Sequence, residues 1–167
     1  NQLNLIEYKT LNINDGDIII YQIGEVDCRC HIKKQLLLGR ELNEIIDELV
    51  DNLFSSIKIN LCDYDNLKII VSCVPPPISK EYYEKLHGEI THEFPFVGTD
   101  LERSEFTKNV NCEIEKKCIE NCFSFLNYYD YYLNEHNTLE VKLSDNRCHI
   151  LKNKFILEKL YEIVENL

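Results

Sequence analysis

The chain has 167 residues, of which 44% are hydrophobic and 28% charged, and this balance fits a single globular domain with a core rather than a disordered segment. Its net charge of −11 at pH 7 disfavours nucleic acid and anionic membrane surfaces as partners, because both would repel it. No stretch is apolar enough to cross a bilayer and the first residues lack a signal-peptide layout, so we expect a soluble, cytoplasmic protein.

The first half of the chain predicts two strands with a helix between them. The run Asp17–Ile23 follows the turn signal Asp15–Gly16 and is rich in β-branched residues, which favours a fully buried strand. From Arg40 to about Asn60, apolar residues recur at intervals of three and four, which predicts an amphipathic helix. The second strand covers Asn66–Val74 and stops at three consecutive prolines, because proline cannot donate to a β-ladder.

The second half predicts a long helix, a third strand and a closing helix. The segment Ile78–Gly98 has no clean period, and we expect a surface insertion there. A helix begins near Asp100, with Asp100 or Thr99 as its cap. The remaining predicted elements are a tyrosine-rich strand over Phe123–Tyr129, a short extended piece over Leu139–Leu143 and a helix over Phe155–Leu167.

This alternation of strands and amphipathic helices predicts an α/β fold. We expect one domain over residues 1–167, built as a three-layer α/β/α sandwich around a mostly parallel sheet, because parallel neighbours need helical crossovers. Sheets usually have five or six strands, and only three are clear in this sequence. The segment Leu3–Leu11 is a further, marginal strand candidate.

Ionisable side chains gather in two blocks that such a fold brings to one edge of the sheet. The block Gly24–His31 directly follows the first strand, and the block Ser144–His149 precedes the last helix. The carboxyl ends of parallel strands line the crevice where open α/β proteins bind ligands, so we expect the two blocks to face each other across a cleft. The candidate site residues are Gly24, Glu25, Asp27, Arg29, His31, Asp145, Arg147 and His149.

Asp145 and His149 have the residue types of the base half of a nucleophile–His–Asp triad, in which a carboxylate holds an imidazole in one tautomer. Four residues apart on an irregular segment, they are equally compatible with a solvated turn capped by the aspartate. For the first block, the alternative to a site role is an ion pair of Arg29 with Glu25 or Asp27 that fixes the loop.

The eight cysteines lie within apolar patterns, and we expect mostly reduced thiols and no metal or other cofactor. Two alternatives involve them. A zinc site would use Cys28, Cys30, His31, Cys148 and His149, which are the right ligand types at an unusual spacing. A thiol nucleophile at Cys28 or Cys30 would need a lowered pKa beside cationic groups such as Arg29 and Arg147.

Five blocks in a fixed order resemble the SGNH/GDSL-hydrolase-like family, over most of the chain from Asp17 to Ile150. They are the run GEVDCRCHIKKQ from Gly24, then Gly39–Ile46, Val74–Pro76, Phe94–Arg103 and Leu143–Ile150. The resemblance implies a flavodoxin-like α/β/α sandwich and the hydrolysis or transfer of an acyl group on an ester, often on carbohydrate. A small-molecule or carbohydrate ester is therefore the expected partner, and a binding module without turnover is the alternative.

The resemblance also implies roles for individual residues. Asp145 and His149 match the family's terminal Asp-x-x-His motif with one extra residue between them, so His149 would be the general base and Asp145 would orient it. The run Gly24–Asp27 takes the place of the family's Gly-x-Asn-Asp block, where the Gly24 backbone and Arg29 would stabilise the oxyanion.

Two departures from the family concern the nucleophile and the oxyanion hole. Nothing before Asp17 offers a Gly-Asp-Ser element, and the first serine is Ser55, within a predicted helix. Val26 stands where the family has an oxyanion-donating asparagine. We therefore expect the chain to lack the family's first strand, which carries the nucleophile and is central in the sheet. One edge of the Asp17–Ile23 strand would then be bare, and the N-terminal segment or a second subunit of a homo-oligomer would cover it.

Overall fold

The computed structural model describes residues 8–167 and has a parallel three-stranded sheet at its centre. The strands β1 (Ile18–Tyr21), β2 (Lys68–Ser72) and β3 (Ser124–Leu126) lie side by side in that order. Ile20 pairs with Ile70, and Val71 pairs with Phe125. Because all the pairings are parallel, the three carboxyl ends lie at the same edge of the sheet.

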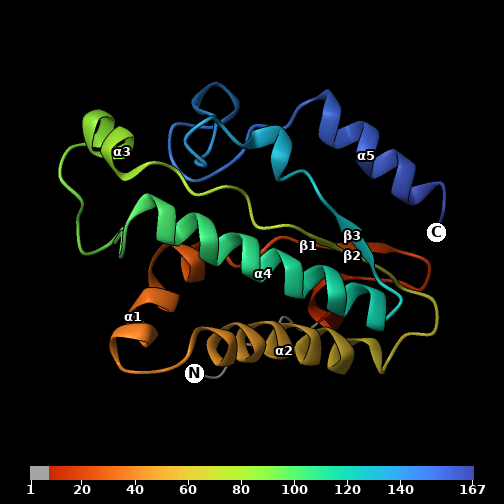
Figure 1. The fold of residues 1–167 in the computed structure, drawn as a ribbon. Helices are drawn as coiled ribbons and strands as arrows, with labels where there is room; N and C mark the ends of the chain where they lie inside the picture. Colours follow the sequence, from red (N-terminus) through yellow and green to blue (C-terminus); the bar gives the residue numbers. More distant parts are fainter. Residues whose placement is uncertain (1–7) are drawn as a thin grey trace.

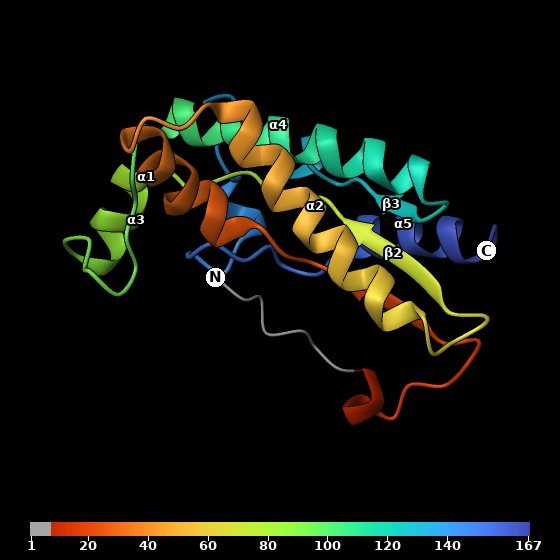
Figure 2. The ribbon, with the colours of Figure 1, turned by 90° about the horizontal axis from the view of Figure 1, so that it is seen from below.

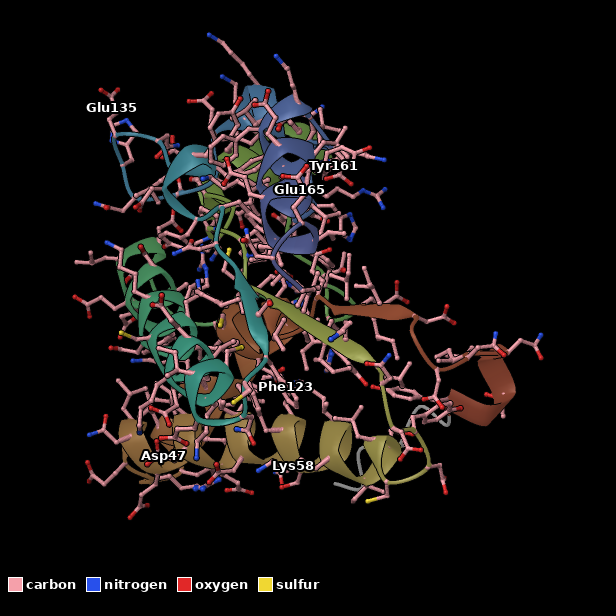
Figure 3. The ribbon with its side chains drawn as sticks, turned by 90° about the vertical axis from the view of Figure 1, so that its right-hand side faces the viewer. Asp47, Lys58, Phe123, Glu135, Tyr161 and Glu165 are labelled. Carbon is pink, nitrogen blue, oxygen red and sulfur yellow. The ribbon has the colours of Figure 1, made fainter. Side chains whose placement is uncertain are left out.

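Helices cover both faces of this sheet. Figures 1 and 2 show α2 and α4 side by side on one face, while α5 lies on the other. Figure 3 shows the same layers from the side, with Lys58 on α2 below the sheet and Tyr161 on α5 above it. The helices of the described chain are α1 (Ile32–Leu37), α2 (Leu42–Leu61), α3 (Lys80–His87), α4 (Asp100–Glu120) and α5 (Lys154–Val164). The α/β fold with a parallel sheet is therefore confirmed.

Each face of the sheet carries its own hydrophobic cluster. On one face, Val50 and Ile57 of α2 and Val110 of α4 pack against Val71 of β2, all of them almost fully buried. On the other face, residues of β2 and β3 pack with the buried tyrosines that follow β3 and with half-buried residues of α5, a cluster that includes Ile70, Leu126, Tyr128, Tyr132, Ile156 and Leu160. The predicted periodicity thus correctly identifies the face that α2 turns to the sheet. For α5 the sequence pattern predicted an apolar stripe through Leu160, Tyr161 and Val164, and this is wrong beyond Leu160, because Tyr161 and Val164 are exposed.

The first strand differs from its prediction, because it is half-exposed rather than fully buried. Ile18 and Ile20 are 40% and 46% exposed, while Ile19 and Tyr21 on the opposite face pack against the core. Among the described residues, β1 pairs only with β2, and α5 covers the sheet at β3. Within residues 8–167, the outer edge of β1 therefore pairs with no other strand.

The two long helices lie close to their predicted positions. Helix α2 begins and ends within two residues of the predicted range. At the start of α4, Thr99 accepts a hydrogen bond from the backbone N–H of Glu102 at 3.1 Å, and the Glu102 carboxylate accepts one from the Thr99 N–H at 2.8 Å. This reciprocal capping box confirms Thr99 as the cap. Cys122 lies two residues beyond the end of α4, with a φ of 55°.

Three segments differ from the sequence predictions. The expected surface insertion Ile78–Gly98 contains α3, and Ile78 itself is buried. The expected extended piece Leu139–Leu143 is mostly a 3₁₀ turn over Val141–Leu143. The block after β1 is helical: it begins at Glu25 and passes through a π-helical turn over Asp27–His31 directly into α1. Short polar segments like these have too few apolar residues for periodicity to identify the helix.

Two expectations concern the N-terminal segment and the membrane. The marginal strand Leu3–Leu11 falls largely outside the described residues, and its described end is a 3₁₀ turn, Tyr8–Leu11. The Tyr8 hydroxyl hydrogen-bonds the hydroxyl of Tyr21 at the end of β1. Within residues 8–167, no helix combines the length and the apolar character needed to span a bilayer.

Candidate active site

A cleft of about 450 Å³ opens at the carboxyl ends of β1 and β2, between the two blocks that the sequence singled out. One wall is the run Gln22–Asp27 after β1, and the opposite wall is formed by Cys148, His149 and Ile150. Pro75, which directly follows β2, lies between them. The sequence reasoning missed Gln22 and Pro75, although their positions at strand ends are the signal that would have identified them.

Gly24 lies in the first wall, between β1 and the helical segment that begins at Glu25. Its φ of 105° is a conformation that residues with a side chain rarely adopt, and a Cβ there would lie 2.8 Å from Cγ2 of Val74. The Gly24 carbonyl accepts the backbone N–H of Cys28 at 3.0 Å, which starts the helix that continues into α1. Glycine therefore lets the chain turn tightly from β1 into a helix while it touches the end of β2.

Arg29 is buried behind this wall and points away from the cleft. Its Nε donates to Oε1 of Glu25 at 2.8 Å, and its Nη1 donates to the Pro95 carbonyl at 2.8 Å. The guanidinium also lies over the ring of Phe94, 3.7 Å from its centre. Arg29 does not line the cleft, whereas Gly24, Glu25 and Asp27 do. The ion pair with Glu25, the alternative weighed for this block, is thus present, and it leaves Arg29 without direct access to the cleft.

Asp145 and His149 meet on the opposite wall. The His149 Nδ1 lies 2.7 Å from Oδ2 of Asp145, while Oδ1 accepts the backbone N–H groups of Arg147 and His149. These bonds lie within a tight turn. Ser144 and Ile150, the residues that flank the turn, pair with each other in an antiparallel bridge. Partial burial raises the pKa of Asp145, but the hydrogen bonds from His149 and the two N–H groups outweigh it and leave this pKa below its usual value.

The 144–150 turn is also tied to α3. The Tyr82 hydroxyl donates to Oδ1 of Asn146 at 3.0 Å, and His87 Nε2 lies 2.8 Å from the Asn146 carbonyl. Asn146 adopts a φ of 64°, which asparagine tolerates better than most residues. The helix that the sequence left unassigned therefore orients the turn that carries His149.

His31 and Arg147 are not brought into the cleft. The His31 Nδ1 pairs with Oδ1 of Asp27 at 2.9 Å, and its ring lines a separate groove between the 25–37 helical segment and α2. Arg147 is exposed, and no described residue accepts a hydrogen bond from its guanidinium. Of the predicted site residues, the cleft therefore gathers Gly24, Glu25, Asp27 and His149, with Asp145 behind His149.

The thiols near the cleft are poorly suited to nucleophilic attack. Burial raises the pKa of Cys28 and of Cys148 to about 12, and it also raises the pKa of Cys30. A cysteine nucleophile needs the opposite shift, and neither Cys28 nor Cys30 lines the cleft, so the structure does not support the thiol alternative. Among residues 8–167, no group of three or more His, Cys, Asp or Glu side chains is arranged to hold a metal ion.

Solved structures show the same fold at low sequence identity. A candidate platelet activating factor from Streptococcus pneumonia is 16% identical, with a TM-score of 0.58 over 90% of this chain and 58% of its own. A candidate acylhydrolase from Bacteroides fragilis is 10% identical, with a TM-score of 0.50 over 89% of this chain and 59% of its own. No family model and no curated protein matches the sequence.

The chain spans just under three-fifths of the length of these two structures. It shares the α/β fold of these two structures, in agreement with the fold class that the sequence predicted. At this level of identity the likeness concerns the fold, and the chemistry has to be argued from the cleft itself.

Proposed function

We propose that this chain acts on an ester as an SGNH-type hydrolase or acyltransferase, with His149 as its general base. The observation that carries the proposal is the Asp145–His149 pair at the rim of a cleft whose other wall follows β1. A small neutral ester, such as an acylated carbohydrate, is the substrate class that the sequence resemblance suggests. The cleft volume of about 450 Å³ lies in the range of small-molecule sites.

The Asp145 carboxylate fixes which nitrogen of His149 is available. An ionised carboxylate only accepts hydrogen bonds, so Nδ1 of the imidazole must carry the proton that bonds Oδ2 at 2.7 Å. Nε2 then has a free lone pair, and no described residue hydrogen-bonds it. An imidazole in this tautomer can take the proton of an attacking hydroxyl and return it to the leaving group.

The start of the helical segment after β1 offers donors for the oxyanion. The first N–H groups of any helix have no intrahelical acceptor, and the helix dipole favours negative charge at that end. Here the helix begins at Glu25, and Glu25, Val26 and Asp27 all line the cleft. These backbone N–H groups take over the stabilisation of the oxyanion that the sequence assigned to Arg29. The Arg29 guanidinium instead donates to Glu25 and to the Pro95 carbonyl behind the wall.

The attacking hydroxyl must come from elsewhere, because the cleft formed by the described residues contains no serine or threonine. In the family that the sequence resembles, the nucleophilic serine follows a strand that is central in the sheet. The outer edge of β1, which pairs with no other strand among the described residues, is adjacent to the cleft and could pair with such a strand. We infer that a strand paired with this edge delivers the hydroxyl to His149.

Ester hydrolysis tests the proposal. The protein, expressed at its natural length, should hydrolyse p-nitrophenyl acetate, and His149→Ala should lower kcat/KM by about 10²–10⁴-fold, the usual contribution of a general base. His31→Ala is the matched control: His31 also pairs with an aspartate four residues away but faces a different groove, so its removal should leave the rate unchanged.

A binding module without turnover is the second candidate. The absence of a hydroxyl from the described lining of the cleft is the observation that favours it. A folded, natural-length protein that binds an acylated sugar but never releases the acyl group would support the module and contradict the hydrolase. Equal losses of rate in His149→Ala and His31→Ala would also contradict the role proposed for His149.

A further inference from the structure

A second, much smaller hollow of about 10 Å³ lies behind the first wall of the cleft. Three charged side chains line it, Glu25, Arg29 and Arg103, together with apolar groups that include Pro75 and Phe96. Of the residues that the structure describes, Glu25 is the only charged one that lines both this hollow and the cleft. Whatever occupies the hollow therefore touches a side chain of the candidate active site.

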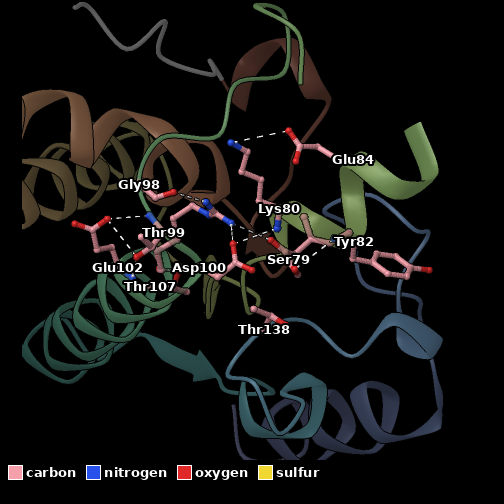
Figure 4. A network of polar contacts seen from close by, with 12 residues as sticks. Ser79, Lys80, Tyr82, Glu84, Gly98, Thr99, Asp100, Glu102, Thr107 and Thr138 are labelled. Carbon is pink, nitrogen blue, oxygen red and sulfur yellow. Dashed lines mark hydrogen bonds and ion pairs between the residues drawn. The ribbon is translucent and has the colours of Figure 1, made fainter. Parts of the chain in front are cut away.

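Arg103 on α4 is fully buried, and one of its donors lacks an acceptor. Its Nη1 donates to the Gly98 carbonyl at 2.9 Å, and its Nη2 donates to the Ile78 carbonyl at 3.3 Å and to Oδ1 of Asp100 at 2.5 Å. Figure 4 shows Gly98 and Asp100 in this network at the start of α4. The Nε of Arg103 is buried without any hydrogen-bond partner among the described residues. A buried donor in this state is unfavourable, and an ordered water is the usual remedy.

The carboxylate of Glu25 has a matching free acceptor. Its Oε1 accepts the Nε of Arg29 at 2.8 Å, and no described residue donates to its Oε2. Glu25 and Arg103 are also within electrostatic range: burial lowers the pKa of Arg103, while the negative charges of Asp100 and Glu25 act in the opposite direction. A donor without an acceptor and an acceptor without a donor thus belong to two side chains that line the same hollow.

We propose that this hollow holds one ordered water, which accepts a hydrogen bond from Nε of Arg103 and donates one to the carboxylate of Glu25. The volume is what a single water requires, on the order of 10–15 Å³.

Through this water, Arg103 influences the cleft although its own side chain does not reach it. Arg103 does not line the cleft, and it acts there only by fixing the orientation of Glu25 from behind. It is therefore a positioning residue. Glu25 in turn presents a held carboxylate to the cleft, which suits a substrate that donates a hydrogen bond, such as a hydroxyl of an acylated polyol.

The first test is a crystal structure of the natural-length protein that resolves ordered waters. It should show one water within about 2.7–3.2 Å of both the Arg103 Nε and a Glu25 oxygen. An empty hollow, a hollow closed by a side-chain shift, or a water that bonds Arg103 but not Glu25 would overturn the proposal. Thr107→Val is the control, because Thr107 lines the hollow but gives its hydroxyl proton to the Arg103 carbonyl, so the water should stay in place.

The second test asks whether Arg103 acts through Glu25, and it rests on the hydrolase proposed above. Arg103→Lys keeps the buried charge but removes the Nε–H group, and Glu25→Gln weakens the acceptor. Each should raise KM for an acetylated sugar by about threefold to tenfold with little change in kcat, because such contacts bind the ground state and the transition state alike. The double variant should be no worse than either single variant.

Additive losses in the double variant would mean that Arg103 only supports the fold, and would contradict the positioning role.

The water proposal and the hydrolase proposal can be contradicted independently of each other. A bridging water in a protein that never hydrolyses esters would overturn the hydrolase alone, whereas a dry hollow in an active, His149-dependent enzyme would overturn the water alone.

Discussion

Each wall of the cleft carries a carboxylate that pairs with a basic side chain four residues later. The pairs are Glu25 with Arg29 and Asp145 with His149. The contact distances are 2.8 Å and 2.7 Å, so geometry alone does not separate the pairs. The two pairs differ in burial, because the Arg29 side chain is 6% exposed, whereas that of His149 is 72% exposed.

The difference decides what each pair can do. Arg29 uses its donors on Glu25 and on the Pro95 carbonyl and stacks on Phe94, so it joins three segments of the chain and has no direct access to the cleft. His149 makes one side-chain hydrogen bond, to Asp145, and keeps Nε2 available. The buried pair therefore stabilises the wall, and the exposed pair is the one to which the proposed function assigns the general base.

The largest expected effect is on the buried pair. Arg29→Met leaves the Glu25 carboxylate without its partner in a mostly buried position, and we expect the free energy of unfolding to fall by about 3–5 kcal/mol. Arg40→Met is the matched control, because Arg40 pairs with Glu48 on the exposed surface and its loss should cost less than about 1 kcal/mol. Urea unfolding of both variants measures the difference, and equal losses would contradict the structural role of Arg29.

The next effect concerns the turn from β1 into the first wall. Gly24→Ala combines an unfavourable φ with a Cβ placed 2.8 Å from Val74, and we expect a loss of about 2–4 kcal/mol. Gly16→Ala has a similar φ but open space around the Cβ, so strain alone should cost about 1–2 kcal/mol. Thermal unfolding compares the two; a smaller loss at Gly24 than at Gly16 would mean that the wall is not packed against the end of β2.

The smallest effect is on the exposed pair and depends on pH. The pKa of Asp145 is below its usual value in the folded state, so its contribution to stability is present above about pH 4, the range where an unfolded aspartate is ionised, and is lost as the pH falls through the lower folded pKa. Asp145→Asn should therefore be less stable than the wild type at neutral pH, by less than about 1 kcal/mol because water screens the pair. The difference in free energy of unfolding between the two proteins should disappear in acid. A difference that grows in acid would contradict a lowered pKa for Asp145.

The sequence predicted the parts of the molecule that depend on local pattern. Periodicity located α2 and α4, and the sequence placed the cap of α4 at Thr99 or Asp100, of which the structure shows Thr99 in a capping box. The Asp145–His149 contact was left open in the sequence, because it depends on a turn that α3 helps to hold.

The buried arginines are what local pattern could not reveal. Arg103 stands among other charged residues in the sequence and looks like a surface position, while for Arg29 the sequence left an ion pair with Glu25 or Asp27 open against a place in the cleft. They are buried because Phe94–Gly98, a segment more than sixty residues after Arg29, folds over them and supplies carbonyl acceptors and aromatic rings. Such partners are known only once the tertiary structure is known.

The central claim is that the 144–150 turn faces the run after β1 across one cleft, and an NMR measurement of nuclear Overhauser effects tests it without any assay of activity. The ring protons of His149 should show contacts to side chains of the opposite wall, such as Ile23 or Val26, which line the same cleft. Contacts confined to residues 144–150, in a protein whose β1–β2 pairing is otherwise intact, would contradict the account.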